Sequence, residues 1–515
     1  MVKRSLLTLV VAAVALLSAV AATTAQDRES VELSLDDCLR MALKNNLDLV
    51  SARYAPELAE QNIGFQLSSF DAAFETYVDH SEREQSAVQL STVTGSETDT
   101  VQLGVQQNLR VGADYTVGFQ TTNNLQTGPN VVAPESWFSG VFLNFNLPLR
   151  RGFGTEVSTE QLVLAETDLE ISRTDLEGRA ETTVEIVEGA YWNVVAAREL
   201  LRIERFSLKR AGDLLELNRK KVEVGTLAPI EITQAEAGVA SQEEGVIVAE
   251  TTLWDAEDEL RSLLAIPESD AMWDKEILNA TRPTFQEMVI DVDQAIAIGL
   301  AERAEVKSAE QTVDNRMLSE RVARRQVRHQ LDFTVNYTPQ GQSLDSPAFI
   351  DPGTGELLFP EQSADLEESI SRIFNGDAYN WNVRLTYRVP IGNRAAKADY
   401  ARARLFREQS QVDLDNQEQT VRVEVRRAAR AVESGIKRVQ AARKNVELQQ
   451  KKLDAEQKKF DNGMSTSFEV LTFQNDLADA ELSEIRARLD YIKALAGLER
   501  AKGTLLESRG LSLAP

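Results

Sequence analysis

The sequence is poor in cysteine, histidine, proline and aromatic residues. Its 515 residues include one cysteine, two histidines and 13 prolines, and aromatic side chains make up 6% of the chain. The single cysteine, Cys38, has no partner for an internal disulfide, and we interpret it as a small buried apolar residue. The scarcity of proline and aromatic residues favours long helices rich in alanine and glutamate over compact mixed domains.

Two further shortages exclude classes of function. His80 and His329 lack the spacing of a metal site and have no candidate nucleophile nearby in sequence, so no catalytic residue, metal ligand or cofactor is predicted and we expect no enzyme. Basic residues number 56 against 81 acidic ones, which gives a net charge of −25. Because such a surface repels phosphate backbones, nucleic acid is not an expected partner.

The N-terminal segment has the order of a secretory signal. Lys3 and Arg4 precede an apolar run over residues 6–22, and small residues follow. This order predicts a signal peptide over 1–25, cleaved after Ala21 or Ala25, with an uncleaved anchor helix as the alternative. Beyond it no run of 18 apolar residues occurs. Helical membrane spans are therefore not expected, and a membrane crossing would need strands closed into a β-barrel.

A seven-residue apolar repeat occurs twice, 238 positions apart. A spacing of seven keeps one stripe of a helix facing a neighbouring helix, as in coiled coils. The first stripe consists of Val187, Val194, Leu201, Leu208, Leu215 and Val222. The second stripe consists of Val425, Val432, Val439, Val446, Leu453 and Phe460. The chain is therefore predicted to contain two related long helices.

Each long helix is followed by a short turn and a return segment. The turns contain Gly225 and Gly463 at equivalent positions. In the return segments apolar residues recur at the same offset, apart from Glu484. We therefore predict two helical hairpins, over 155–265 and 394–507, the first with an outgoing helix on the order of 100 Å long.

Segments in which apolar and polar residues alternate lie between the helices. One face of each is apolar and aromatic and the other is polar, the pattern of a strand between lipid and water. A half-buried strand of a soluble sheet is the alternative. The stretch 340–379 is predicted to be a long exposed loop. The predicted strands cover residues 101–109, 115–119, 141–147, 331–338 and 381–389, with 74–79 as a weaker candidate.

The predicted strands are too few for a closed barrel, which needs at least about eight. One chain could contribute to a barrel only by sharing it with other copies. The sequence therefore predicts a homo-oligomer whose copies together form a barrel and a helical tube. The seven-residue repeats alone are equally compatible with an exported coiled-coil rod, which needs no strands.

The order of helix, strands, long helix, turn and return helix, given twice after a signal peptide, resembles the TolC-type outer membrane efflux protein family. The openings of the two copies, 35–46 and 292–300, match those of the family. The resemblance implies a mainly α fold with β-strands, in which two repeats carry long coiled-coil hairpins. The first repeat, 26–290, has a helix, barrel strands, the hairpin 155–265 and a short equatorial segment. The second, 291–515, has a helix, barrel strands within 331–389 and the hairpin 394–507.

The resemblance also implies an assembly and a function. The family forms homotrimers with a twelve-stranded barrel in the outer membrane and a long α-helical tunnel in the periplasm. Outer membrane lipid, a periplasmic adaptor and an inner-membrane transporter are the implied partners. The implied function is passive conduction of substrates to the exterior, in efflux or type I secretion. The residues alone leave open a structural coiled-coil protein of the cell envelope; a periplasmic adaptor would need a compact β-rich domain, which the sequence does not show.

The resemblance carries over to a few residues at the periplasmic tip. In the family, the turns equivalent to Gly225 and Gly463 lie at this tip, and acidic residues beyond them narrow the tunnel entrance. Glu231 and Glu469 fall where the family commonly has an acid, whereas Thr472 replaces a second acid. A different role fits the two glutamates equally well, because an acid in the first turn of a helix stabilises its dipole.

Overall fold

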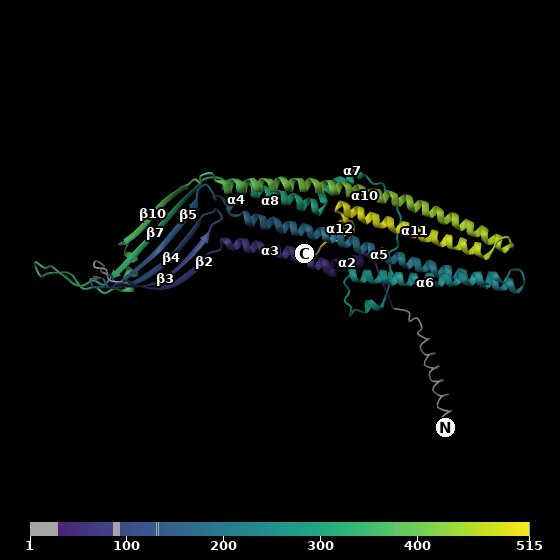
Figure 1. The fold of residues 1–515 in the computed structure, drawn as a ribbon, viewed down its shortest axis with the longest axis horizontal. Coiled ribbons are helices and arrows are strands. Elements are labelled where there is room, and N and C mark those ends of the chain that lie inside the picture. The colour runs from purple at the N-terminus through teal and green to yellow at the C-terminus, as the bar shows by residue number, and fades with distance from the viewer. Residues whose placement is uncertain (1–28, 86–92, 130, 132, 377, 514–515) are drawn as a thin grey trace, which may run out of the picture. The chain divides into compact units, whose positions relative to one another are not determined.

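A computed structural model describes residues 29–85, 93–129, 131, 133–376 and 378–513 (Figure 1). The predicted signal peptide, 1–25, lies outside the described residues. The chain divides into two compact units, which we call the helical unit and the sheet unit. The helical unit contains the described residues up to Tyr54, with Thr174–Lys307 and Gln417 onward, and the sheet unit contains Ala55–Arg173 and Ser308–Asn416.

Long helices dominate the chain. The outgoing helices are α5 (Glu160–Glu223) and α10 (Arg394–Asp461), and the return helices are α6 (Ile230–Leu263) and α11 (Ser467–Lys502). The helix expected to run on from residue 155 is broken at Thr159, which separates α5 from a short α4 (Thr155–Ser158). The remaining helices are α2 (Leu35–Asn45), α3 (Leu47–Leu67), α7 (Val292–Glu302), α8 (Ala304–Gln326), α9 (Leu366–Asn375) and α12 (Leu505–Ser508).

The predicted apolar stripes form the core of the helical unit. Val187 and Val194 of α5 are fully buried, as are Val425, Val432 and Val439 of α10. Toward the turns the core continues in one cluster of Leu214, Phe460 and Val470, with Leu217 and Leu471 packed against it. Other stripe members, Leu208, Leu215 and Val446, are only half-buried. The heptad prediction is therefore confirmed, and the half-buried members leave apolar surface on the single chain.

Ion pairs tie each return helix to its outgoing helix. Arg205 of α5 lies 2.8 Å from Glu250 of α6. In the second hairpin Glu484, which interrupts the apolar pattern of the return segment, lies 3.4 Å from Arg443 and 2.6 Å from Arg488. The charged residue that interrupts the apolar pattern, Glu484, is therefore neutralised by two neighbouring arginines.

The buried seam generates a first prediction. Val432→Asp would place an unpaired carboxylate among apolar side chains, which costs on the order of 3 kcal/mol or more. We expect a large loss of helical signal on heating, followed by circular dichroism at 222 nm. Ser434→Asp, an exposed position on the same helix that receives the same charge, is the matched control and should unfold like the parent. Equal unfolding temperatures for the two variants would contradict the seam.

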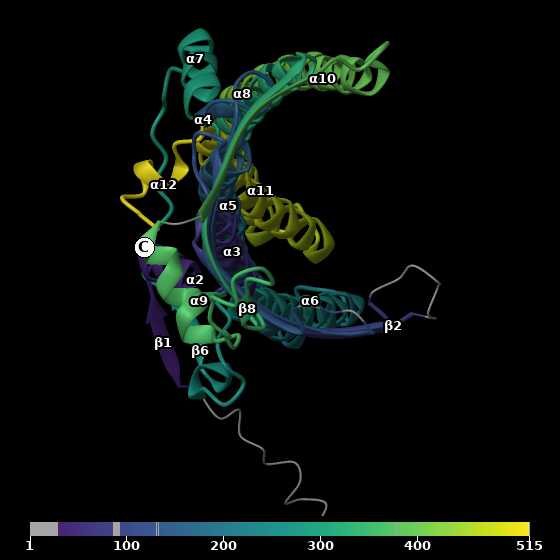
Figure 2. The same cartoon turned by 90° about the vertical axis from the view of Figure 1, so that its left-hand side faces the viewer.

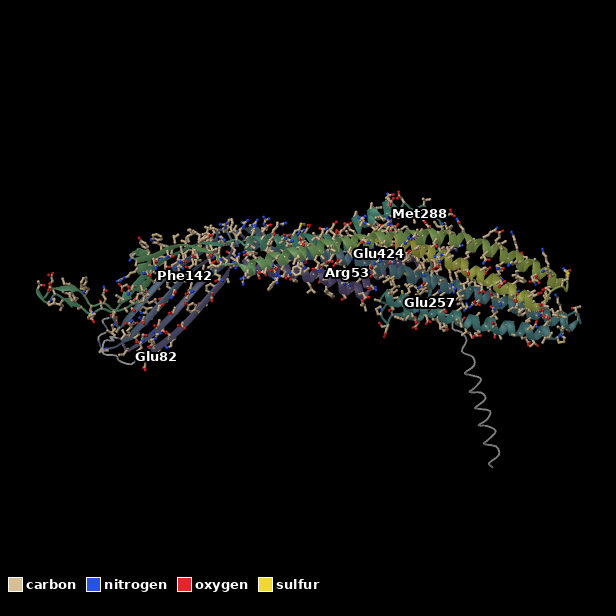
Figure 3. All side chains as sticks on the ribbon, turned by 45° about the horizontal axis from the view of Figure 1, so that its top comes forward. Arg53, Glu82, Phe142, Glu257, Met288 and Glu424 are labelled. Atoms are coloured by element: carbon tan, nitrogen blue, oxygen red, sulfur yellow. The ribbon has the colours of Figure 1, made fainter. Side chains whose placement is uncertain are left out.

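Buried charges anchor the shorter elements of the helical unit. Glu257 of α6, labelled in Figure 3, is fully buried and lies 3.3 Å from Arg198 and 3.2 Å from Arg261. It also accepts the backbone N–H of Ile277 at 3.1 Å. Ile277 belongs to β6 (Glu276–Asn279), which pairs in parallel with β1 (Ser30–Leu33). This network therefore fixes a small two-stranded sheet to the side of the hairpin.

The half-buried carboxyl of Glu181, in the same unit, has a pKa near neutral. Glu181 of α5 accepts the N–H of Leu505 at 3.2 Å, and burial raises the pKa of its carboxyl to about 7. Because the ordinary pKa is 4.5, the folded state binds this proton more tightly than the unfolded chain does. The stability that Glu181 contributes is therefore complete below about pH 4.5 and is lost as the pH rises toward 7.

The second prediction follows from that sign. Glu181→Gln keeps the acceptor and removes the titration, so its urea midpoint should exceed that of the parent by more at pH 8 than at pH 5. Glu177→Gln, at an exposed position of the same helix, should show no such pH dependence. A difference between Glu181→Gln and the parent that is the same at both pH values would contradict the assignment.

The sheet unit is built on one antiparallel six-stranded sheet (Figure 1). Its strand order is β10-β7-β5-β4-β3-β2. All predicted strands are confirmed, including the weaker candidate at 74–79, which lies within β2. However, a twelve-stranded trimer needs four strands per chain, and this sheet has six. The strands are β2 (Ala73–Glu84), β3 (Gly95–Asn108), β4 (Asp114–Thr127), β5 (Glu135–Pro148), β7 (Gln330–Leu344) and β10 (Ala378–Arg388).

The two faces of the sheet differ in chemistry across all six strands. The register places one apolar side chain of each strand in a continuous line, which we call the apolar row. On the opposite face the lines are mostly amides, hydroxyls and glycines, such as Gln102, Gln120, Gly140 and Gln340. The apolar row consists of Phe74, Val105, Val117, Leu143, Tyr337 and Trp381.

The stretch predicted as a loop, 340–379, has structure of its own. Strand β7 continues to Leu344, and β8 (Phe349–Ile350) pairs with β9 (Leu357–Phe359). Helix α9 follows, capped by Asp365, whose side chain accepts the N–H of Glu368 at 3.0 Å. The loop prediction is therefore wrong over much of its length, because a ten-residue helix with a strong cap can form within a polar segment.

Helix α9 packs on the face that carries the apolar row. The hydroxyl oxygens of Ser369 and Ser139 lie 2.7 Å apart, and Arg372 donates to the carbonyl of Gln342 at 2.8 Å. A Cβ at Gly341 would collide with the Ser369 carbonyl oxygen. Small residues at 139 and 341 therefore make room for this helix, which lies on the convex side of the sheet in Figure 2.

Within the described part of the chain, no strand pairs with the outer edge of either terminal strand of the sheet. The edge strands are β2 and β10, and their apolar side chains are the most exposed of the apolar row, with Phe74 at 68% and Trp381 at 64%. Among the described residues, no helix is both long enough and apolar enough to cross a membrane.

Candidate functional site

Both hairpin turns end their outgoing helix in the same way. Gly225 and Gly463 have φ of +74° and +72°, which only glycine adopts without strain. Each glycine N–H bonds the carbonyl three residues back, and the next N–H bonds the carbonyl five residues back, on Lys221 and Lys459. This is the Schellman pattern. The two glycines at equivalent positions in the sequence therefore end the two outgoing helices with the same geometry.

The return helices begin differently. In the second hairpin Thr466 caps α11, with its side chain accepting the N–H of Glu469 at 3.3 Å. In the first hairpin the equivalent region has Pro229 at the cap position, and no side-chain cap is present there. The start of α11 is therefore held more firmly than the start of α6.

Glu231 contacts the other hairpin. Its carboxylate accepts the backbone N–H of Ser467, the first residue of α11, at 3.1 Å. The buried amide of Asn218 donates to the Ser467 hydroxyl at 2.6 Å and to the Glu231 carbonyl at 3.2 Å. Glu231 thus supplies negative charge at a helix N-terminus, as the dipole interpretation expects, although the helix is α11 and not its own.

Glu469 belongs to a second polar cluster. The Ser465 hydroxyl lies 2.7 Å from Glu469 Oε2 and 2.5 Å from Glu456 Oε1, and its single proton can serve only one of them. Lys459 lies 2.9 Å from Glu456. The hydrogen bonds from Ser465 and Lys459 lower the pKa of Glu456. The carboxylates of Glu456 and Glu469 therefore share one hydroxyl at this turn, and the Lys459 ammonium group pairs with Glu456.

Two buried polar residues near Glu231 and Glu469, namely Asn218 and Glu456, were not predicted from the sequence. Asn218 and Glu456 are 238 residues apart, the offset of the two repeats, and both are buried. Each reaches from an outgoing helix to the start of the following turn or return helix. The sequence signal that could have identified them is a polar residue at the same position of the two repeats, within an otherwise apolar helix face.

Thr472 lies away from these clusters. It is exposed on α11, and its hydroxyl donates to the Phe468 carbonyl of the same helix at 2.9 Å. The structure therefore brings Glu231 to Ser467 and Glu469 to Ser465, whereas Thr472 makes only a local contact. The entrance role predicted for all three stays a prediction.

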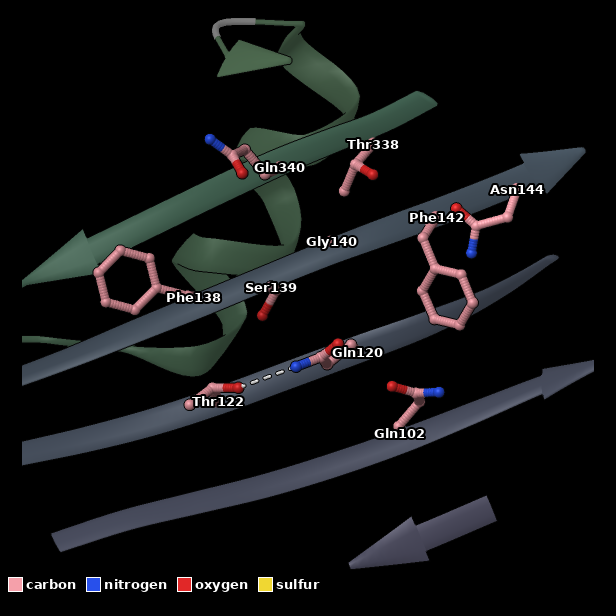
Figure 4. A pocket seen from close by; sticks show the side chains of 10 residues that line it. All are labelled: Gln102, Gln120, Thr122, Phe138, Ser139, Gly140, Phe142, Asn144, Thr338 and Gln340. Atoms are coloured by element: carbon pink, nitrogen blue, oxygen red, sulfur yellow. Dashed lines mark hydrogen bonds between the residues drawn. The ribbon is translucent and has the colours of Figure 1, made fainter. Parts of the chain in front are cut away.

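The polar face of the sheet has a hollow of about 430 Å³ (Figure 4). Two phenyl rings, Phe138 and Phe142, project into a wall of amides and hydroxyls. Phe142 lies over Gly118, where a Cβ would come within 2.5 Å of the ring. The residues that line the hollow carry no charge: they are Gln102, Gln120, Thr122, Phe138, Ser139, Gly140, Phe142, Asn144, Thr338 and Gln340.

The structure also places His80 beside acidic residues of the next strand. Its Nδ1 lies 2.7 Å from Asp99 Oδ1 and 3.9 Å from Glu97 Oε1. All three side chains are on the outer part of β2 and β3 and are largely exposed. A cross-strand ion pair accounts for this contact. Cys38 is fully buried, as predicted, and burial raises the pKa of its thiol to about 12.

Solved outer membrane channels share this fold. The CmeC outer membrane channel of Campylobacter jejuni is 16% identical with a TM-score of 0.65, over 93% of this chain and 87% of that chain. The open state of the MtrE outer membrane channel of Neisseria gonorrhoeae is 17% identical with a TM-score of 0.62, over 92% and 89%. VceC of Vibrio cholerae, an outer membrane protein, is 12% identical with a TM-score of 0.63, over 91% and 96%. No curated protein shows significant sequence similarity to the chain.

These likenesses show that the chain shares the fold of solved outer membrane channels. The sequence model described as "Outer membrane efflux protein" matches residues 38–265 and again 282–504, well over half of the chain. The chain therefore belongs to the outer membrane efflux protein family, as its sequence pattern indicated. This is a family of channels and not of enzymes, and membership places the protein in the outer membrane with its helical tunnel in the periplasm.

Proposed function

We propose that three copies of this chain form a channel-tunnel that passively conducts solutes from the periplasm to the exterior. The sheet has two free edges and two chemically different faces, and this observation supports the proposal most directly. Backbone groups of an edge strand cannot stay unpaired in lipid. Pairing β10 of one copy with β2 of the next satisfies both edges and continues the apolar row around the outside.

The inner wall of such an assembly suits a conduit. The uncharged hollow of the polar face would border water, and its amides can hydrate many solutes without holding one tightly. We also propose that the chain consists of two repeats, 26–290 and 291–515, as two separate matches to the family support. An adaptor and an inner-membrane transporter are the proposed partners, in efflux or in type I secretion.

Assembly and conduction test the proposal together. Light scattering of the detergent-solubilised protein should give the mass of three chains, and the same preparation should conduct ions in planar bilayers. The mass must be corrected for bound detergent. A stable monomer that conducts would overturn the shared wall, whereas a trimer that washes off membranes with carbonate would favour the coiled-coil rod.

The tip is the proposed entrance. Three copies would bring three pairs of Glu231 and Glu469 to the end of the tunnel, where a narrow aqueous ring focuses the field of its charges. The contacts of both carboxylates with Ser467 and Ser465 would hold them in place near the turns. Cations should therefore pass more readily than anions.

Charge reversal at these positions tests the entrance. Replacing both Glu231 and Glu469 by lysine should reverse the sign of the zero-current potential in a KCl gradient, by an amount that shrinks as salt rises. Glu216 and Asp454 form the matched control, because they are exposed, equivalent to each other in the two repeats, and lie on the outgoing helices. Lysine at both control positions should leave the selectivity nearly unchanged. Equal shifts for the two double variants would show that the glutamates act only through net charge.

A further inference from the structure

The strand count of this chain departs from the twelve-stranded wall that the family resemblance implies. Of the six strands of the large sheet, β2 to β5 precede the first long hairpin, and β7 and β10 precede the second. We infer that three copies close a barrel of eighteen strands, wider than a twelve-stranded one and open to bulkier solutes. The inference rests on the proposed trimer, because the strand number of the barrel is three times that of the chain.

The extra hairpin of β3 and β4 is part of the wall by its pairing. β3 pairs with β2 from Ala73↔Gln106 to Glu84↔Gly95, and β4 pairs with β5 from Asp114↔Asn146 to Leu125↔Glu135. Strands of 14 residues exceed the roughly 9 to 11 that cross a membrane. The hairpin is therefore long enough to span, and it is hydrogen-bonded along both flanks.

The side chains of the hairpin repeat the two-faced pattern of the other strands. Val105 and Val117 continue the apolar row between Phe74 and Leu143. On the opposite face Gln102 and Gln120 lie in line with Gly140 of β5. A hairpin lying in water outside the wall would gain nothing from an apolar row that matches its neighbours residue by residue.

Packing on the polar face locks the hairpin to β5. Phe142 of β5 extends over two glycines, Gly104 of β3 and Gly118 of β4, which pair with each other. A Cβ on Gly104 would lie 3.5 Å from the ring, and one on Gly118 would lie 2.5 Å from it. The ring covers a stretch of bare backbone, and it can do so only when all three strands are in one sheet.

The number of strands sets the width. With strands about 4.8 Å apart and tilted by about 40°, eighteen strands give a backbone radius of roughly 18 Å and twelve give roughly 12 Å. Inward side chains occupy about 5 Å of either radius. The clear cross-section is therefore about three times larger with eighteen strands. Solutes that a twelve-stranded barrel would exclude by size can pass this one.

Cryo-electron microscopy of the trimer in lipid nanodiscs measures the strand number and width directly. We expect eighteen strands in the wall. A twelve-stranded wall with β3 and β4 outside it, or a dimer that closes twelve strands, would overturn the inference. Either result would leave conduction by the assembly intact, although the dimer would also replace the proposed trimer. A protein that neither assembles nor conducts would refute the proposed function.

Thiol labelling gives a second test that needs no redesign of the sheet. Gln120→Cys, on the polar face of β4, should react with a membrane-impermeant maleimide in proteoliposomes, and Val117→Cys, on the apolar row of the same strand, should be protected at least tenfold. The native Cys38 is buried and provides little background. Equal reaction of the two variants would place β4 in water on both faces and overturn the inference. Leu143→Cys and Asn144→Cys on β5 provide the reference pair for a strand in the wall.

Discussion

Unpaired backbone at the two edges of one sheet is the constraint on which the rest of this structure depends. In water an edge strand can be hydrated, but within lipid each free N–H and C=O costs several kcal/mol. A six-stranded sheet with an apolar face cannot meet that requirement in a single copy. In the proposed assembly, the exposed rings of Phe74 and Trp381 would lie where one copy pairs with the next. The half-buried stripe members Leu208 and Val446 would be covered in the same way on the helices.

Much of this architecture could be predicted from the sequence because it is periodic. A seven-residue apolar stripe indicates a helix that packs against another helix, and its repetition at a fixed offset identified both hairpins and both glycine turns. Alternation of apolar and polar residues located the strands, because it indicates a strand with two different faces. Periodicity carries no information on the number of strands that share a sheet. The expectation of a twelve-stranded wall came from the family resemblance, whereas the sheet of this chain has six strands. The short α9 was missed since one capped helix within a polar segment has no repeat.

At the tip, prediction from the sequence identified positions but not contacts. Glu231 and Glu469 were identified because they match positions at which the resembled family commonly has an acid. That Glu231 reaches Ser467 of the other hairpin depends on how the return helices pack, and Gly238 lies close to Leu471 there. Asn218 and Glu456 were overlooked because a single polar residue within a helix is normally solvated. Their burial results from the tertiary packing, which a sequence pattern does not contain.

The two hairpin ends share the geometry of their glycine turns but differ in how the return helix begins. One return helix starts at Pro229 without a side-chain cap, and the other starts under Thr466. In a ring of three copies the six turns therefore alternate between two kinds, and the rim has threefold and not sixfold symmetry. A protein that docks end-on against this rim would meet two chemically distinct sets of turns, and a single subunit type would have to bind one set or adapt to both.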